Sequence, residues 1–448
     1  MNQPVQFTSS LLKTLDVSLL SLSFLTFPIS RFVALSAIAL FFLKRILSFS
    51  TINRQNLITA IALYTSLLLL AFQFYRSGGW EVFTNNHLYP VTSHDYLVVI
   101  VTFFAIKLNP LTVDQLQKIL DVFSLTPLIV FLIHWQNFSF DIRTDMGFEN
   151  PNLLGLYLAV SIPVILFSLL QNRSHLPQSI GLGLKIIRLT TLLLAFLMLL
   201  ASGSKSSLLV TLFNFVLISF YFIKPIVIPN KNHQDDSGSI LLPSSDRDSR
   251  TTENNWNNYS IKLHLKPRKI VLFSFFLFLT LITIYLLTQQ SLTVLERFFT
   301  IWDESSQLRV QIYRCFYNLG MEKFWFGWFP ENTAKLCENQ LGWLTGEVNH
   351  AHNFILQLFV DYGIIAVLVI LYILVIGFLL PLYNSLKDNR NYNPKISYLV
   401  YGLFFSNLAV VLISLLQSAF YHDPFFPLWL GLFWGSQNAL LLGDYMNY

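Results

Sequence analysis

The stretch NLLGLYLAVSIPVILFSLLQ, residues 152–171, decides the class of fold, because it carries no charged side chain over its whole length. A helix of about 20 apolar residues is long enough to cross the hydrocarbon core of a bilayer. The rest of the chain has the same character, since 54% of its 448 residues are hydrophobic and only 12% are charged. Soluble domains carry roughly 25% charged residues, so this composition predicts an integral membrane protein.

Further apolar stretches predict the other membrane spans. The stretch from Leu11 to Phe42 is interrupted by Pro28 and Arg31, and it fits either one long helix or a tight pair. We expect the remaining spans at residues 56–75, 94–108, 117–136, 186–201, 205–228, 270–288, 364–384, 397–419 and 425–443.

The distribution of charge favours the helix pair, and with it twelve spans in total. Both termini are then cytoplasmic, and the cytoplasmic connections hold 19 Lys and Arg residues, more than twice the number on the opposite face. Basic residues accumulate in the cytoplasmic loops of membrane proteins. The same rule accounts for the net charge of +5 without a nucleic-acid partner. The sequence therefore predicts an all-α, polytopic membrane protein of about twelve transmembrane helices.

Two long loops divide the predicted helices into groups. Residues 229–268 are polar and without periodicity, which is typical of a disordered loop, here a cytoplasmic one. Residues 289–352 are rich in aromatic side chains and fall on the outer face, where we expect a folded periplasmic loop domain. N-terminal transmembrane helices are expected over residues 1–228, a further span over 269–288 and C-terminal transmembrane helices over 353–448.

Both cysteines of the chain, Cys315 and Cys337, lie in the predicted outer loop. A disulfide between them would stabilise the loop by about 3 kcal/mol through the reduced entropy of the unfolded chain. Two free thiols are the alternative. The spacing in the sequence does not separate the two interpretations.

Three polar segments of the outer face carry the candidate chemistry. In GFENPNLLGLY, residues 147–157, Pro151 and Asn152 are typical of a helix start, with Asn152 as the capping residue or the helix end as an anion site. In ASGSKSSLLV, residues 201–210, Lys205 either reaches back to the interface or binds a negative group. In the third, Arg309 precedes VNHAHNF, in which His352 is either a general base or a helix cap.

The spacing of His352, Asn353, Gly363 and Ala366 resembles the signature of the O-antigen ligase and polymerase superfamily. That signature has His, a polar residue, nine further residues, Gly, and a small residue or Tyr three places later. The Asn-Pro-Asn segment, the segment around Lys205 and the later arginine follow the order of the family. The resemblance spans about residues 147–372.

The resemblance implies a C-type glycosyltransferase-like enzyme of the bacterial inner membrane, active at the periplasmic face in lipopolysaccharide biosynthesis. It implies transfer of a glycan from undecaprenyl diphosphate to a glycolipid or glycan acceptor, with inversion and without a metal or nucleotide cofactor. By position, His352 corresponds to the catalytic histidine, Arg309 to the arginine that holds the donor diphosphate, and Lys205 to a second diphosphate-binding cation, for which the family usually has Arg. The candidates for supporting residues are His350, Asn353, Arg314 and Glu347.

Three alternatives to a ligase stay open at this point. A polysaccharide polymerase differs only in its acceptor, and the histidine signature favours the ligase. A transporter of an inorganic anion such as bicarbonate fits the same cations, although the chain has no internal repeat and carries a bulky outer loop. A degenerate member that acts as an assembly subunit is suggested by Lys205 in place of Arg.

Overall fold

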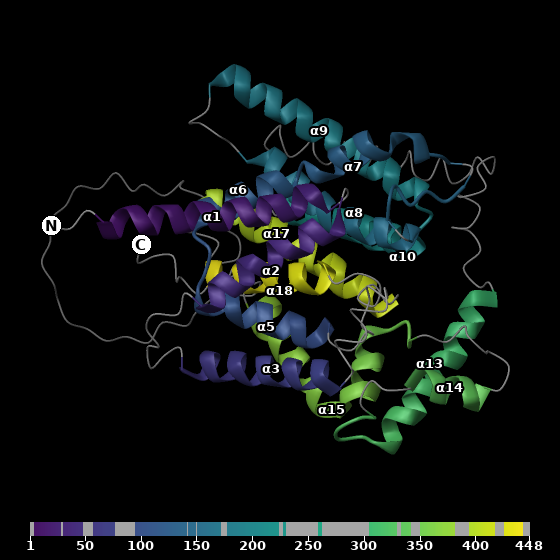
Figure 1. Cartoon of the computed structure of the whole chain (residues 1–448). Coiled ribbons are helices and arrows are strands. Elements are labelled where there is room, and N and C mark those ends of the chain that lie inside the picture. Colours follow the sequence, from purple (N-terminus) through teal and green to yellow (C-terminus); the bar gives the residue numbers. More distant parts are fainter. Residues whose placement is uncertain are drawn as a thin grey trace, which may run out of the picture. The chain divides into compact units, whose positions relative to one another are not determined.

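The structure is a computed structural model of the chain (Figure 1). It describes residues 4–27, 30–47, 57–76, 95–140, 142–148, 150–171, 177–223, 227–229, 259–261, 304–328, 333–341, 350–380, 394–416 and 425–441. The chain divides into two units, one formed by Met1–Asn214 with Leu287–Tyr448 and the other by Phe215–Leu286.

The described part of the chain is helical apart from its loops and two short strands. The helices are α1 Pro4–Thr26, α2 Arg31–Leu47, α3 Leu57–Arg76, α5 Asp95–Leu108, α6 Val113–Phe123, α7 Thr126–His134, α8 Pro151–Leu170, α9 Gln178–Ala201, α10 Lys205–Ile223, α13 Glu304–Glu322, α14 Thr333–Leu341, α15 Phe354–Leu374, α17 Pro394–Leu416 and α18 Phe425–Leu441. A 3₁₀ turn, η2 Trp135–Asn137, follows α7, and a π turn, η4 Val375–Leu379, follows α15.

The second unit contains the two strands, β1 Val227–Pro229 and β2 Tyr259–Ile261, which pair antiparallel. Both strands border or fall within the predicted disordered loop, residues 229–268. The structure describes this loop only at Pro229 and in β2, so its disorder stays a prediction.

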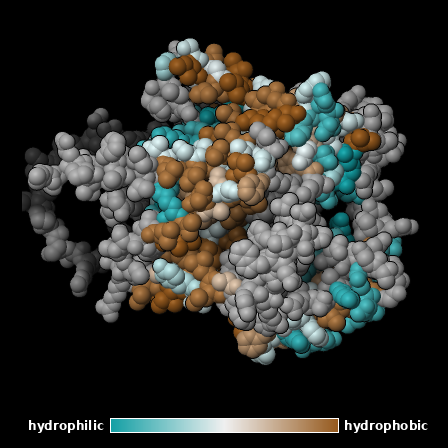
Figure 2. Space-filling view, viewed as in Figure 1, coloured by the Kyte–Doolittle hydropathy of each residue, from teal (hydrophilic) through white to brown (hydrophobic). Residues whose placement is uncertain are grey.

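Five described helical segments are long and apolar enough to cross a membrane. They are Val113–Asn137, Pro151–Leu170, Ser179–Ala201, Phe354–Leu374 and Tyr398–Leu416, and four shorter apolar helices accompany them. Figure 2 shows hydrophobic residues on much of the visible helix surface, as expected for helices in contact with lipid. The chain is therefore a helical, multi-pass membrane protein. The total of twelve spans stays a prediction, and the span expected at 270–288 lies outside the described residues.

The N-terminal apolar stretch forms the tight pair that the charge distribution favours, since α1 ends at Thr26 and α2 begins at Arg31. Two ion pairs join the middle of α1 to the end of α2, since Asp16 contacts Lys44 and Arg45, each at 2.7 Å. The two cations offset the free-energy cost of removing the Asp16 carboxylate from water.

The span expected at 117–136 is divided into two helices, α6 and α7. Pro127 lies in the first turn of α7, where its missing N–H costs nothing, but a continuous helix through that position would lose a hydrogen bond. The hydroxyl of Thr126 donates to the carbonyl of Phe123 and helps to satisfy the end of α6. Hydrophobicity alone did not indicate this break.

Helix α17 runs antiparallel to α8. The Ser406 hydroxyl donates to the Val160 carbonyl at 2.8 Å, and Gly402 contacts Phe167. Residue numbers therefore fall along α8 as they rise along α17. The C-terminal end of α17 consequently lies at the level of the N-terminal end of α8.

Helix α10 lies against α8 and α17, and its first turn lies at the level of the N-terminal end of α8. Gly155, near the start of α8, faces the side chains of Ser204 and Ser207 so closely that an added Cβ would lie 2.6 Å from the Ser204 Cβ. Further along, the Asn214 amide donates to the Phe405 carbonyl at 3.0 Å. The start of α10 lies about 14 Å from that contact and the end of α17 about 16 Å, because a helix rises about 1.5 Å per residue. One end of the bundle thus holds the starts of α8 and α10 and the end of α17.

Candidate functional site

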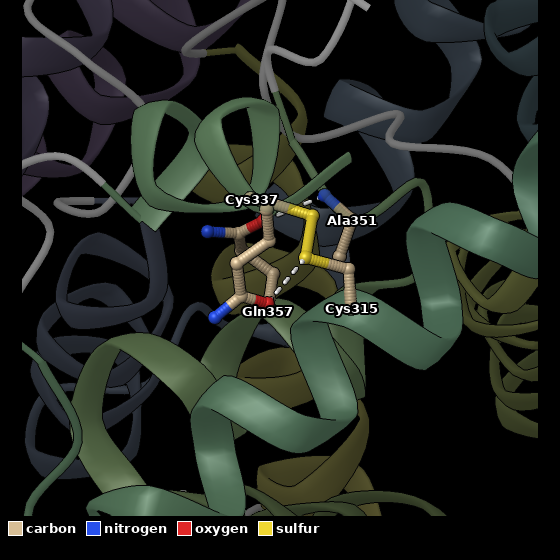
Figure 3. The surroundings of a disulfide bond; sticks show 5 residues. Cys315, Cys337, Ala351 and Gln357 are labelled. Atoms are coloured by element: carbon tan, nitrogen blue, oxygen red, sulfur yellow. Dashed lines mark hydrogen bonds between the residues drawn. A yellow bond between two sulfur atoms is a disulfide. The ribbon is translucent and has the colours of Figure 1, made fainter. Parts of the chain in front are cut away.

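A disulfide joins two helices of the predicted outer loop, α13 and α14. The Cα atoms of Cys315 and Cys337 are 5.8 Å apart, and Figure 3 shows the bond beside the start of α15. Of the two interpretations that the sequence left open, the structure has the disulfide. The bond lies in a buried cluster, the disulfide cluster, whose members are Ile312, Cys315, Phe316, Leu319, Cys337, Ala351 and Val360.

The residues His350 to His352 form the turn that leads into α15, here called the histidine turn. Ala351 is fully buried in the disulfide cluster, and its N–H donates to the Gln357 side-chain oxygen at 2.8 Å (Figure 3). The imidazole rings of His350 and His352 lie with their centroids 4.2 Å apart. His352 has a φ of 50°, in the left-handed region that only a few per cent of non-glycine residues adopt, most often Asn, Asp and His.

Asn353 fixes the histidine turn to the bundle. Its side-chain oxygen accepts from the Leu356 N–H at 3.0 Å and caps α15, while its side-chain nitrogen donates to the Leu415 carbonyl at 3.1 Å. Leu415 belongs to the last turn of α17. The histidine turn therefore lies at the end of the bundle where α8 and α10 begin.

Arg309 and His352 are connected through Tyr313. Arg309 precedes Tyr313 by four positions on α13, so the two side chains share one face of the helix. The Tyr313 hydroxyl donates to the His352 backbone carbonyl at 3.4 Å. Burial raises the pKa of Tyr313, and the nearby positive charge of Arg309 acts in the opposite direction. A tyrosine phenol is already protonated at neutral pH at its ordinary pKa, and the raised pKa keeps Tyr313 a donor.

Lys205 is the first residue of α10 and follows a tightly bonded turn. Gly203 in this turn has a φ of 61°, and the Ser204 N–H donates to the Ser202 hydroxyl at 3.3 Å. The turn is linked to the chain before α8, because the Thr144 N–H donates to the Ala201 carbonyl at 3.1 Å. Lys205 therefore shares its end of the bundle with the histidine turn, through the contacts of α8, α10 and α17.

Arg143 is a cation at this end of the bundle that the sequence interpretation missed. Its Nε donates to the Ser202 carbonyl at 3.0 Å and its Nη2 donates to the Asn152 side-chain oxygen at 2.6 Å. One guanidinium thus ties the turn before Lys205 to the start of α8. The available signal was an isolated arginine in DIRTDMGFENPN, in a loop otherwise poor in cations.

The capping residue of α8 is Asn150, so the expectation that Asn152 caps this helix is wrong. The Asn150 side-chain oxygen accepts from the Asn152 N–H at 2.8 Å, and Pro151 is the first helical residue, as expected. A residue before proline is held in extended backbone, which is also the conformation of a capping residue. The Asn152 side chain is left to accept from Arg143.

The remaining candidates have different surroundings. Arg314 is exposed on α13, and Glu347 lies outside the described residues. Within the described ranges, no group of three or more His, Cys, Asp or Glu side chains is arranged to hold a metal ion.

Helix α15 is broken at Gly363, whose φ of 75° and ψ of −175° are accessible essentially only to glycine. The break leaves backbone groups for other partners: the Trp328 N–H donates to the Val360 carbonyl at 2.8 Å, and the Ile364 N–H donates to the Phe324 carbonyl at 2.9 Å. A Cβ on Gly363 would collide with the backbone carbonyl of Trp325. The glycine of the sequence signature thus permits a close contact of two backbones.

Gly363→Ala is expected to destabilise the folded protein by about 3 kcal/mol. The alanine would have to adopt a strained backbone conformation, and its Cβ would collide with the Trp325 carbonyl. Thermal unfolding in detergent measures the effect. Gly183→Ala is the matched control, since a Cβ there, on α9, has nothing within 4 Å. The control is expected to be neutral or slightly stabilising. Equal unfolding temperatures for the two variants would contradict the argument.

The fold and the site define a class: a polytopic helical membrane protein with cations and an imidazole at one end of its bundle, beside two helices joined by a disulfide. Residues 190–371 match the sequence profile of the family described as O-antigen ligase, and this part of the chain belongs to the O-antigen ligase superfamily. The match confirms the resemblance, covers about two fifths of the chain and includes Lys205, Arg309 and His352. The matched part of the chain is thus related to membrane enzymes of the glycosyltransferase type. No curated protein matches the chain.

Proposed function

We propose that the protein transfers a glycan from a polyprenyl-diphosphate carrier to a glycolipid or glycan acceptor, as an O-antigen ligase does. The observation that carries this proposal is the connection of Arg309 with His352 through Tyr313, at the end of the bundle where Lys205 begins α10. Cations and an imidazole at the same end of the bundle suit a reaction in which a charged group leaves and a hydroxyl loses its proton.

In the proposed reaction, Lys205 and Arg309 bind the donor diphosphate. Cleavage of the bond between the anomeric carbon and the phosphate oxygen leaves negative charge on the diphosphate, which stays attached to the polyprenyl carrier. Cations that are already in place stabilise this charge in the transition state more effectively than water does. Lys205 supplies a point charge where an arginine would supply a planar, two-pronged donor, so the substitution keeps attraction but loses geometric specificity.

His352 is proposed as the general base. Its imidazole takes the proton from the acceptor hydroxyl while the hydroxyl oxygen attacks the anomeric carbon from the side opposite the leaving diphosphate. The configuration at that carbon is therefore inverted. The charge of the leaving group is neutralised by side chains in this mechanism, so we propose that it proceeds without a metal or nucleotide cofactor.

We propose that the site faces the periplasm and that the protein resides in the bacterial inner membrane with twelve spans. Two observations support this orientation. The Lys- and Arg-rich connections are assigned to the opposite face by the positive-inside rule. The Cys315–Cys337 disulfide lies beside the histidine turn, and disulfides form and persist in oxidising compartments such as the periplasm.

Purified protein in proteoliposomes tests the proposed function directly. With a lipid-linked oligosaccharide and an acceptor glycolipid supplied together, we expect a product in which the glycan is attached to the acceptor, detected by mass spectrometry. Elongation of the glycan on the carrier, with no acceptor glycolipid modified, would instead identify a polymerase. Uptake of labelled bicarbonate without any lipid-linked sugar, and no transfer, would replace the enzyme by a transporter. A protein inactive in all three assays would favour an assembly subunit.

A further inference from the structure

We propose that the Cys315–Cys337 disulfide positions His352, so that closing the bond holds the histidine turn in the conformation needed for transfer and reducing it releases the turn. This inference rests on the proposed function of His352, and it adds Cys315 and Cys337 to the residues on which that function depends. Neither cysteine touches the reacting atoms in this proposal; both act through the backbone of the turn.

The first link is direct packing of the turn on the disulfide cluster. Ala351, between the two histidines, is fully buried in the cluster that contains both cysteines (Figure 3). His350 is also buried, with 6% of its surface exposed. A shift of the cysteines therefore displaces the atoms that support the turn, because protein interiors are close-packed.

The second link is a chain of hydrogen bonds that runs from α14 to the turn through α15. The Thr333 hydroxyl, at the start of α14, donates to Asp361 at 3.2 Å. The Gln357 side-chain nitrogen donates to both oxygens of Asp361 at 2.9 Å, which leaves the Gln357 oxygen to accept from the Ala351 N–H. The orientation of Gln357, and with it the hold on the turn, thus depends on where α14 lies.

The disulfide keeps α14 in place. Helix α14 has nine residues, and helices of that length are unstable in water without tertiary contacts. Helix α13 has an attachment of its own, since Gly320 packs against the Phe359 ring and the Trp328 indole N–H donates to the Leu319 carbonyl. Reduction is therefore expected to loosen α14 and the turn while α13, with Arg309, stays near α15.

The backbone of His352 makes the turn sensitive to such loosening. A residue other than glycine with a φ of 50° is kept there only by its surroundings. Once the support from Ala351 and Gln357 weakens, His352 relaxes toward an ordinary conformation and its imidazole leaves its position. A displacement of about 1 Å is enough to lower a rate by about 100-fold.

The test compares oxidised and reduced full-length protein in proteoliposomes, with a phosphine reductant and a lipid-linked oligosaccharide as donor. We expect reduction to lower kcat by about 100-fold, to change the donor KM by less than about threefold, and to be reversed by reoxidation. The double variant Cys315→Ser with Cys337→Ser is the matched control: its kcat should equal that of the reduced wild type and should not respond to the reductant. An unchanged kcat in reduced wild-type protein, with both thiols shown free by alkylation, overturns the proposal.

Hydrogen exchange supplies a readout that needs no activity. On reduction, amides of residues 350–357 should exchange faster, while amides of α8 and α17 should keep their protection. Unchanged exchange of 350–357, or equally faster exchange throughout α8 and α17, overturns the proposal, because the first shows no release and the second shows general unfolding. Faster exchange confined to α14 and the turn, in a protein that is inactive even when oxidised, supports the hold on the turn and contradicts the proposed transferase.

Discussion

Replacement of His352 with asparagine is expected to lower kcat for glycan transfer by about 1,000-fold, the middle of the range for loss of a general base. Asparagine is the sharper choice than alanine, because it adopts a positive φ readily and so keeps the backbone of the histidine turn while removing the imidazole. Donor affinity should stay near that of the wild type, since the proposed diphosphate ligands are untouched. Steady-state transfer and separate donor-binding measurements check both statements.

The outcome of this substitution is informative only if the variant folds, so its thermal unfolding is measured alongside. Transfer within about tenfold of the wild type by a folded His352→Asn protein would remove the general base from the mechanism. The loss is expected to be largest at neutral pH, because no other group takes over the proton there. Recovery of the rate at high pH, where the acceptor ionises by itself, would agree with the assigned role.

Removal of a diphosphate-binding charge is expected to have the second-largest effect. Arg309→Gln and Lys205→Gln should each reduce kcat/KM for the donor by about 100- to 1,000-fold, because each removes a preorganised charge from the leaving group. Lys205→Arg should retain activity or improve it, since the guanidinium adds a second donor to the phosphate oxygens. Initial rates at several donor concentrations separate the effects on kcat from those on KM.

Lys335→Gln is the control for the two charge substitutions. Lys335 is exposed on α14, so its replacement changes the net charge equally and should leave the donor kinetics unchanged. If all three glutamine variants lose activity alike, general electrostatics rather than a local diphosphate site explains the loss. If none does, Lys205 and Arg309 do not bind the donor.

The spans could be predicted from the sequence because a long run of apolar residues is stable mainly where it faces lipid or is buried beside other helices in the membrane. The break at Gly363 illustrates the limit: the glycine belongs to the signature, but the span expected at 364–384 gave no indication that a helix also precedes it, as α15 does from Phe354. Likewise Asn150 and Asn152 both flank Pro151, and only the backbone geometry shows which of them is the cap.

The contacts of the candidate site were beyond the sequence for a different reason. Tyr313 donates to a carbonyl 39 positions away, and Arg143 to one 59 positions away, and no local pattern encodes either distance. The pairing of Cys315 with Cys337 was open for the same reason, since it depends on where α14 packs. The chemistry of a residue can be inferred from its type, whereas its neighbours follow from the whole fold.

The close contact of two backbone segments at Gly363 affects how the protein is inserted into the membrane. The Val360 carbonyl and the Ile364 N–H of α15 form their hydrogen bonds with residues 324–328. Peptide groups without a hydrogen-bond partner are costly in hydrocarbon. The ribosome delivers that turn before it delivers α15, so the partner is already synthesised when the broken helix enters the membrane. A circularly permuted chain that begins after residue 328 would reverse this order of synthesis. We expect it to insert α15 with these two hydrogen bonds unmade and to be degraded more readily than a control permutant that is opened between α17 and α18.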